Sequence, residues 1–410
     1  MTAASPNLRI VAPRLPTPGS RELAELLAAV AEGASERDAT RTLPFAQIDL
    51  LRAARFGALR LRKEEGGAGL TLRELLSVVI ELAAADPNVA HIVRNHFGYV
   101  ERFALPSTGD RHLRWAQLVA GGAIVGLAMN EINARSLGGT SFDTRLVARG
   151  DGFTLAGVKY FSTGSLFSDY VMIRAQDEAD RFVSAIVPAD RKGLTLEDDW
   201  DGLGQRLTGT GTTRLDDVRV AADEVIFDDE SEGFGFARPY TGSYSQLFLT
   251  AIVAGILRNA AEDAAELVRT RKRSFSFAPA EHPADDPILQ QAVGEIASSA
   301  FAAEAAVLAA AEALDRAVAS RVDGAPDIDA AHAGALAAAK AKVVVDALAI
   351  RAGSQVFDAG GASATKKSAN LDRHWRNART LASHNPAAYK ARSVGQHLIS
   401  GERLPLTGFY

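Results

Sequence analysis

The chain of 410 residues contains no cysteine. Disulfide bonds, thiolate nucleophiles and metal sites with cysteine ligands are therefore excluded. An excess of one charge is also missing, because 45 Lys and Arg face 50 Asp and Glu and leave a formal net charge of -5. A chain with this net charge is not expected, as a whole, to attract nucleic acid electrostatically. The start lacks a basic segment followed by a continuous apolar core, and Pro13, Pro16 and Pro18 indicate a loose leader, so we expect a cytoplasmic protein.

Long apolar runs and nucleotide-binding fingerprints are scarce as well. The most apolar helical stretch, 297–311, is dominated by alanine and interrupted by Glu304, so we expect no membrane-spanning helix. Gly202 and Gly204 lack the third glycine and the strand-to-helix setting of a dinucleotide fingerprint. The sequence therefore has no recognisable nicotinamide-binding motif.

Carboxylates are missing from one informative stretch near the C-terminus. Residues 373–386, RHWRNARTLASHNP, are basic and carry two histidines, and the next acidic residue is Glu402. A site that removes a proton from carbon usually needs a base such as Glu, whereas a site that holds a peroxide or an anion needs hydrogen-bond donors. The stretch therefore favours imidazole and amide chemistry.

The residues that are present divide the chain into three zones. Apolar residues recur at helical spacing from about 20 to 121, and short β-rich runs broken by Gly and Asp follow as far as 227. Helical spacing returns in long Ala-rich segments, roughly 245–271, 288–321 and 328–356. We expect an α+β fold, mainly α, whose long helices bury their apolar faces within or between subunits. The expected parts are an N-terminal helical domain (1–122), a central β-domain (123–232), and a C-terminal helical bundle with its tail (233–410).

This order, with several short motifs, resembles the acyl-CoA dehydrogenase superfamily over nearly the whole chain. Within it the chain is most similar to the flavin monooxygenase branch typified by dibenzothiophene monooxygenase, through 198–213, RKRSF at 271–275, and HNPAAYK at 384–390. The superfamily pieces, in chain order, are DPNVA at 86–90, AMNE at 128–131, GVKYFSTG at 157–164, GLGQRLTGTGTT at 202–213, GGASAT at 360–365 and RHWRNAR at 373–379.

The resemblance implies an acyl-CoA dehydrogenase-like fold and a homotetramer with flavin between the domains. In the dehydrogenases the segment after the RNAR-like tract ends in Tyr-Glu-Gly, whose Glu is a common position of the catalytic base. Here the matching residues are His384, Asn385 and Pro386. An amide cannot accept a proton from a carbon acid, so this departure favours oxygen chemistry over dehydrogenation. The monooxygenase pattern has a further histidine where this chain has Leu381, which suggests a different substrate or a more apolar pocket.

Two histidines are candidate catalytic residues. His384 matches the tail histidine that contacts flavin and substrate in the monooxygenase branch; the alternative is an ordinary loop histidine. His96, on a helix with Phe97 and Val100 nearby, matches an active-site histidine; the alternative is a core histidine satisfied by a backbone carbonyl. His91 is expected to be a surface or packing residue.

The remaining candidates would contact the flavin. Asn130 and Thr163, candidates for both catalysis and flavin binding, take the places of the polar residues beside the flavin ring, or else bond their own backbone. Arg271 and Arg273 would bind the flavin phosphate, or else interact with a helix dipole. Ser363 could add a hydroxyl.

The resulting hypothesis is a two-component flavin-dependent monooxygenase. It would take reduced FMN from a separate flavin reductase and form a flavin hydroperoxide with O2. The substrate would be a hydrophobic small molecule: an organosulfur compound, an indole or other aromatic, or an amine. One alternative is an FAD-dependent acyl-CoA dehydrogenase with a relocated base such as Glu266. The other is a flavin-fold relative that binds nucleic acid through its basic C-terminal face.

Overall fold

The computed structural model describes residues 14–104, 110–132, 141–228, 240, 242–322 and 326–406. Its N-terminal part is helical, as predicted. Thr71 begins α4 with a capping box to Glu74, and Asp86 ends α4 and caps α5 by accepting from the backbone of Asn88 and Val89. The helices are α1 (Arg21–Ala31), α2 (Ala34–Thr40), α3 (Phe45–Ala53), α4 (Leu72–Ala85), α5 (Pro87–Ile92), α6 (Arg94–Tyr99) and α7 (Asp110–Ala120).

The central part is an eight-stranded sheet in the order β6-β7-β3-β2-β4-β5-β8, with β1 paired parallel to β4. The strands β3 to β7 lie within β-rich runs that the sequence predicted, whereas β1, β2 and β8 were not predicted individually. The strands are β1 (Val125–Ala128), β2 (Arg145–Arg149), β3 (Gly152–Lys159), β4 (Tyr170–Asp177), β5 (Phe182–Pro188), β6 (Leu194–Leu196), β7 (Thr213–Ala221) and β8 (Val225–Phe227).

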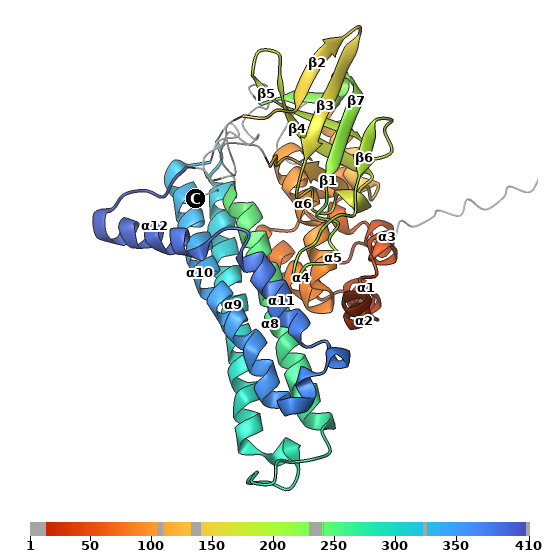
Figure 1. The fold of residues 1–410 in the computed structure, drawn as a ribbon. Helices are drawn as coiled ribbons and strands as arrows, with labels where there is room; N and C mark the ends of the chain where they lie inside the picture. The colour runs from red at the N-terminus through yellow and green to blue at the C-terminus, as the bar shows by residue number, and fades with distance from the viewer. Residues whose placement is uncertain are drawn as a thin grey trace, which may run out of the picture.

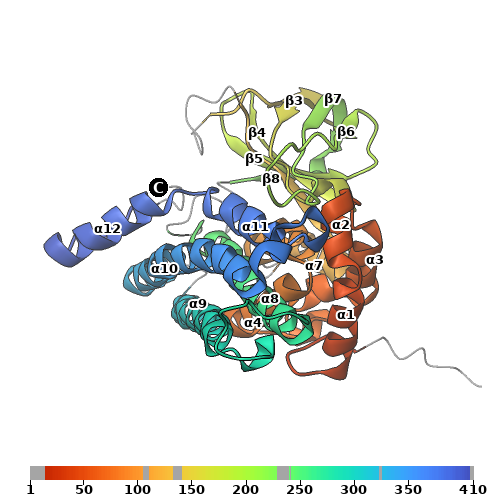
Figure 2. The same cartoon turned by 60° about the horizontal axis from the view of Figure 1, so that its bottom comes forward.

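The C-terminal part is a helical bundle. Figure 1 shows α8 (Gly242–Thr270), α9 (Pro287–Ala319) and α10 (Ile328–Gly360) running side by side, with the sheet stacked on the N-terminal helices beside one end of the bundle. Buried alanines allow the three helices to approach closely. The shorter α11 (Asp372–Ala382) packs on α8 and α10, while α12 (Ala387–Ser400) extends away from the body in Figures 1 and 2.

The predicted fold class, α+β and mainly α with an acyl-CoA dehydrogenase-like arrangement, is confirmed. Among the described residues, one helix, α9, is long and apolar enough to cross a membrane by length and composition alone. It packs against α8 and α10, and a single helix of this kind is weak evidence for a membrane span. The fold places the sheet's loops next to α5, α6 and the beginning of α8, and the candidate site forms there.

Candidate functional site

One wall of the site is built by loops at the edge of the sheet. Asn130 follows β1 and Thr163 follows β3, and a bridge between Asn130 and Tyr160 brings the two segments together through a 2.8 Å hydrogen bond from the Tyr160 N–H to the Asn130 carbonyl. The Asn130 side-chain amide makes no hydrogen bond to another described residue and stays available to a ligand. The Thr163 hydroxyl lies 2.9 Å from that of Thr210.

A buried ion pair, which the sequence reasoning missed, holds these segments in place. The Lys159 ammonium donates to the Glu131 carboxylate at 2.6 Å, and the Lys side chain is completely buried. Glu131 also accepts from the backbone of Asp143 and Thr144 and from the Thr144 hydroxyl. Burial lowers the pKa of Lys159 to about 8, which leaves the ammonium charged at pH 7. The motifs AMNE and GVKYF thus contain one buried contact that positions Asn130 and Thr163.

The aromatic side chains at this edge are unusually exposed. Phe161 is 49% exposed and has φ +56°, a conformation that costs energy for a bulky side chain and is often kept for function. Trp200 meets it edge to face with ring centroids 6.2 Å apart. Together they provide an apolar surface beside Thr163 for a planar ring.

Gln205 links this wall to the bundle. Its own φ is +53°, and its N–H donates to the Asn377 side chain on α11 at 2.6 Å. Its side-chain oxygen lies 3.0 Å from Nδ1 of His91 on α5. A Cβ on Gly204 would lie 2.1 Å from the carbonyl oxygen of Arg376, which explains the glycine beside this crossing point.

His91 is the second residue that the sequence reasoning missed. It is 6% exposed, so of the two expected alternatives, a surface or a packing residue, the structure shows a buried packing position, and its Nε2 is buried with no partner among the described residues. Burial lowers its pKa well below the usual range, and the nearby charge of Arg94 lowers it further. A neutral imidazole with one nitrogen held and the other free suits a ligand contact.

His384 lies close enough for its charge to influence His91. It follows α11 and is exposed in this single chain, with Nδ1 3.2 Å from the Asn385 side-chain oxygen. Although part of this residue is exposed, the protein packed around the ring desolvates it and lowers its pKa, and the charges of Arg94 and Lys342 contribute. Both histidines are therefore neutral at pH 7, and His384 remains a candidate site residue.

His96 occupies a different position from the one predicted. It is completely buried, its Nε2 donates to the Gly57 carbonyl at 3.1 Å, and its Nδ1 accepts from the Val125 N–H at 3.1 Å. Burial lowers its pKa to about 4. Because one neutral tautomer satisfies both nitrogens, no polar atom of the ring is left for flavin or substrate. The contacts are those of the alternative, a core histidine that joins the start of β1 to the N-terminal helices.

The predicted phosphate-binding residues lie at the opposite end of the bundle. Thr163 lies near the start of α8. Asn95 of α6 donates to the Thr163 carbonyl at 2.8 Å, and its neighbour Arg94 donates to the Ser245 carbonyl near the start of α8. Arg271 follows the end of α8, a helix of 29 residues that spans roughly 43 Å. Its guanidinium approaches Gly361. Arg273 lies two residues after Arg271, Ser363 lies two residues after Gly361, and both are exposed. Within one chain these three residues do not share a site with Thr163.

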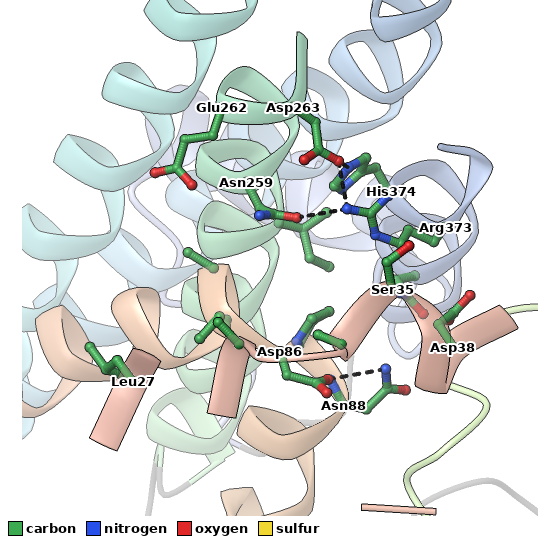
Figure 3. Close-up of a pocket in the computed structure, with 18 of the residues that line it drawn as sticks. Leu27, Ser35, Asp38, Asp86, Asn88, Asn259, Glu262, Asp263, Arg373 and His374 are labelled. Carbon is green, nitrogen blue, oxygen red and sulfur yellow. Dashed lines mark hydrogen bonds and ion pairs between the residues drawn. The ribbon is translucent and has the colours of Figure 1, made fainter. Parts of the chain in front are cut away.

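The basic C-terminal stretch is largely explained by ion pairs. In Figure 3, Asp263 of α8 accepts from Arg373 and, at 2.8 Å, from His374, both on α11. Arg376 pairs with Asp38 of α2 at 2.7 Å. Asp38, Asp263, Arg373 and His374 line a cavity of about 440 Å³ between α1, α2, α4, α8 and α11, whose opposite wall is mostly alanine. The arginines therefore join the bundle to the N-terminal helices, and this cavity contains none of the predicted site residues.

The residues near Thr163 fit a flavin. The exposed Phe161 and the half-buried Trp200 offer a surface for the planar ring, and the Asn130 amide offers hydrogen bonds to its polar edge. On the bundle side, the unpartnered buried atoms His91 Nε2, Tyr244 Oη and Asn385 Nδ2 are donors or acceptors that a ligand could satisfy. Bound flavin would supply redox chemistry that no side chain of the chain can provide.

Known proteins match nearly the whole chain. The family models for the acyl-CoA dehydrogenase middle domain and C-terminal domain match residues 126–218 and 247–388. Dibenzothiophene monooxygenase of Rhodococcus erythropolis is 30% identical over 408 residues, which cover 96% of this chain and 95% of that protein. The crystal structure of FMN-bound TdsC from Paenibacillus sp. A11-2 is 28% identical with a TM-score of 0.86, covering 95% of this chain and 100% of that one. Methanesulfinate monooxygenase MsuC from Pseudomonas fluorescens is 28% identical with a TM-score of 0.85, covering 95% and 99%.

Proposed function

The chain belongs to the acyl-CoA dehydrogenase superfamily, in its branch of flavin-dependent monooxygenases, and we propose that it oxygenates a small organosulfur compound with reduced FMN and O2. A separate flavin reductase supplies the reduced FMN, since the sequence has no recognisable nicotinamide-binding motif. FMN is favoured because TdsC, so similar in fold, was crystallised with it. Bound reduced flavin supplies the electrons that activate O2, and the chain's own residues orient the reactants and exclude water.

The observation that carries this proposal is the absence of a carboxylate base where a dehydrogenase would need one. Asn385 stands at the usual position of that base, and the first half of α8, Gly242–Arg258, contains no Asp or Glu. The groups that remain, His91 and His384, are neutral imidazoles. Their lowered pKa values make both rings weak bases toward a carbon acid, while their nitrogens can donate or accept hydrogen bonds with a reactive oxygen species.

The substrate class is supported at a coarse level by the relatives. Dibenzothiophene monooxygenase and methanesulfinate monooxygenase are both named for sulfur compounds, and TdsC was also crystallised with FMN and indole. An organosulfur substrate is therefore preferred to the amine, with an indole or another aromatic as the second choice.

We propose the homotetramer that the family resemblance implies, and two observations support an assembly of more than one chain. FMN is much shorter than α8, so Arg271 and Arg273 can contact the phosphate of a flavin beside Thr163 only if they come from another chain. Apolar side chains also stand exposed, with Phe301 on α9 at 76% and Ile399 on α12 at 89%. Light scattering tests the assembly, and a stable, active monomer would contradict it.

Glu266, the base named for the FAD-dependent dehydrogenase alternative, does not lie in the candidate site of its own chain. Glu266 is exposed near the far end of α8 and pairs with Arg269. Anaerobic titration distinguishes the two functions: we expect saturable binding of reduced FMN and weak binding of FAD. Tight stoichiometric FAD with no affinity for reduced FMN would overturn the monooxygenase proposal. The nucleic-acid alternative predicts salt-sensitive DNA binding, and the pairing of Arg373 and Arg376 with acidic residues weakens its basis.

A further inference from the structure

Arg94 is a half-buried arginine in the candidate site whose charge has no acidic partner. It is the first residue of α6 and lies three positions after His91. Its Nε donates to the Ser245 carbonyl at 3.1 Å, which fixes the direction of the guanidinium group. In the described part of the chain no carboxylate forms an ion pair with it, unlike Arg37, Arg60 and Arg174, which are as deeply placed and each have one.

The surroundings of Arg94 add positive charge instead of neutralising it. Burial and, to a smaller extent, the neighbouring cation Arg102 together lower its pKa to about 10, so it stays protonated at pH 7. Its charge in turn lowers the pKa of His91 and His384, which places it within electrostatic reach of both. An uncompensated cation away from bulk water is costly, and a bound anion removes that cost.

The chemistry of the group selects the kind of anion. With Nε held by a carbonyl, the two terminal nitrogens of the guanidinium form a planar fork, which matches the two oxygens of a sulfinate, sulfonate or carboxylate. Asn95, the next residue, donates to the Thr163 carbonyl. The Arg94 guanidinium therefore belongs to a residue adjacent in sequence to one that contacts the proposed flavin-binding loop.

We propose that Arg94 binds the oxyanion of an anionic substrate, so that this enzyme oxygenates small organic sulfinates in preference to neutral aromatic sulfur compounds. The inference rests on the proposed monooxygenase function. In the reaction, the sulfur lone pair of the sulfinate forms a bond to one oxygen atom of O2 and gives a sulfonate. The other oxygen atom leaves as water, with two electrons and two protons from the reduced flavin, which becomes oxidised. The negative charge is conserved, so Arg94 can hold substrate and product alike.

Methanesulfinate and dimethyl sulfoxide form a matched pair of probes, because they differ by replacement of one charged oxygen with a methyl group. We expect Arg94→Met to lower kcat/KM for methanesulfinate on the order of 100-fold, mainly through KM, while any turnover of dimethyl sulfoxide changes little. Arg94→Lys should recover only part of the loss, because it keeps the charge without the fork. Arg73→Met, which removes an exposed arginine paired with Glu312, is the control for net charge.

A competing source of the anion is the phosphate of FMN itself, and binding measurements separate the two. Calorimetric titration of methanesulfinate into wild-type and Arg94→Met protein should show binding only to the wild type, whether or not flavin chemistry occurs. The affinity for reduced FMN should be the same in the wild type and in Arg94→Met, and so should the affinity for reduced riboflavin. Selective loss of FMN but not riboflavin affinity in Arg94→Met would assign Arg94 to the phosphate and overturn the proposal. Equal losses of activity on methanesulfinate and on dimethyl sulfoxide in Arg94→Met would overturn it too. So would a wild-type protein that does not bind methanesulfinate. Failure to bind reduced FMN at all would refute the monooxygenase function instead.

Discussion

Replacement of His96 by Ala should destabilise the protein strongly, and not merely impair turnover. The change leaves the Gly57 carbonyl and the Val125 N–H without partners, and each unsatisfied buried group costs about 1–3 kcal/mol. The lost ring packs edge to face on Phe97, with centroids 5.4 Å apart, so a cavity adds to the loss. We therefore expect the free energy of unfolding to fall by at least about 4 kcal/mol.

Urea denaturation followed by fluorescence measures this difference, with His282→Ala, an exposed loop histidine, as the control. The same residue predicts a pH dependence. Its folded-state pKa of about 4 lies below the ordinary histidine value of 6.5, so the unfolded state takes up a proton first as pH falls. Its contribution is complete above pH 6.5 and declines toward pH 4, by about 3 kcal/mol in total. A loss below about 1 kcal/mol in His96→Ala would refute the assignment of His96 to the core.

Three further predictions concern the site. His384→Ala should leave folding and reduced-flavin binding intact while product falls and hydrogen peroxide rises, since loss of one positioned donor costs ~100- to 1000-fold in the step it serves; unchanged coupling would return His384 to an ordinary loop residue. His91→Ala should produce the same uncoupling, measured as the ratio of peroxide to product, and a normal ratio would remove it from the site. Lys159→Met should cost about 3–5 kcal/mol in chemical denaturation because it leaves the Glu131 carboxylate buried and unpaired, whereas the exposed Lys192→Met should be nearly neutral.

The sequence predicted the long elements well because each has a strong periodic signal. The segments expected at 245–271, 288–321 and 328–356 are observed as α8, α9 and α10 with small differences at their ends. The strands β1, β2 and β8, of four, five and three residues, were not predicted individually, whereas β6, also of three residues, lies within a predicted β-rich run.

The two histidines of the 88–98 segment show where sequence reasoning reached its limit. They are five residues apart, which on one continuous helix would place them about 140° apart, so only one could face the flavin. The chain actually divides at Val93 into α5 and α6, and this break turns His91 toward Gln205 and His96 toward Gly57. The motif identified the segment, and only long-range contacts distinguish the site residue from the core residue.

The separation of Arg271, Arg273 and Ser363 from Asn130 and Thr163 has a similar origin. Family resemblance indicates that these residues contact one flavin, but it does not say which chain supplies each of them. The length of α8 decides that a single chain cannot supply both sets. Their roles as flavin contacts therefore stay predictions that depend on the assembly.

Rapid mixing of the enzyme–reduced FMN complex with oxygenated buffer tests the central claim most directly. The reaction is followed by absorbance in the region of the flavin hydroperoxide, without substrate and then with methanesulfinate. A monooxygenase should accumulate a transient flavin species that lasts much longer than in free solution, and substrate should hasten its decay to oxidised FMN with formation of methanesulfonate. Oxidation of the bound flavin as fast as that of free reduced FMN, with hydrogen peroxide as the sole product, would contradict the account.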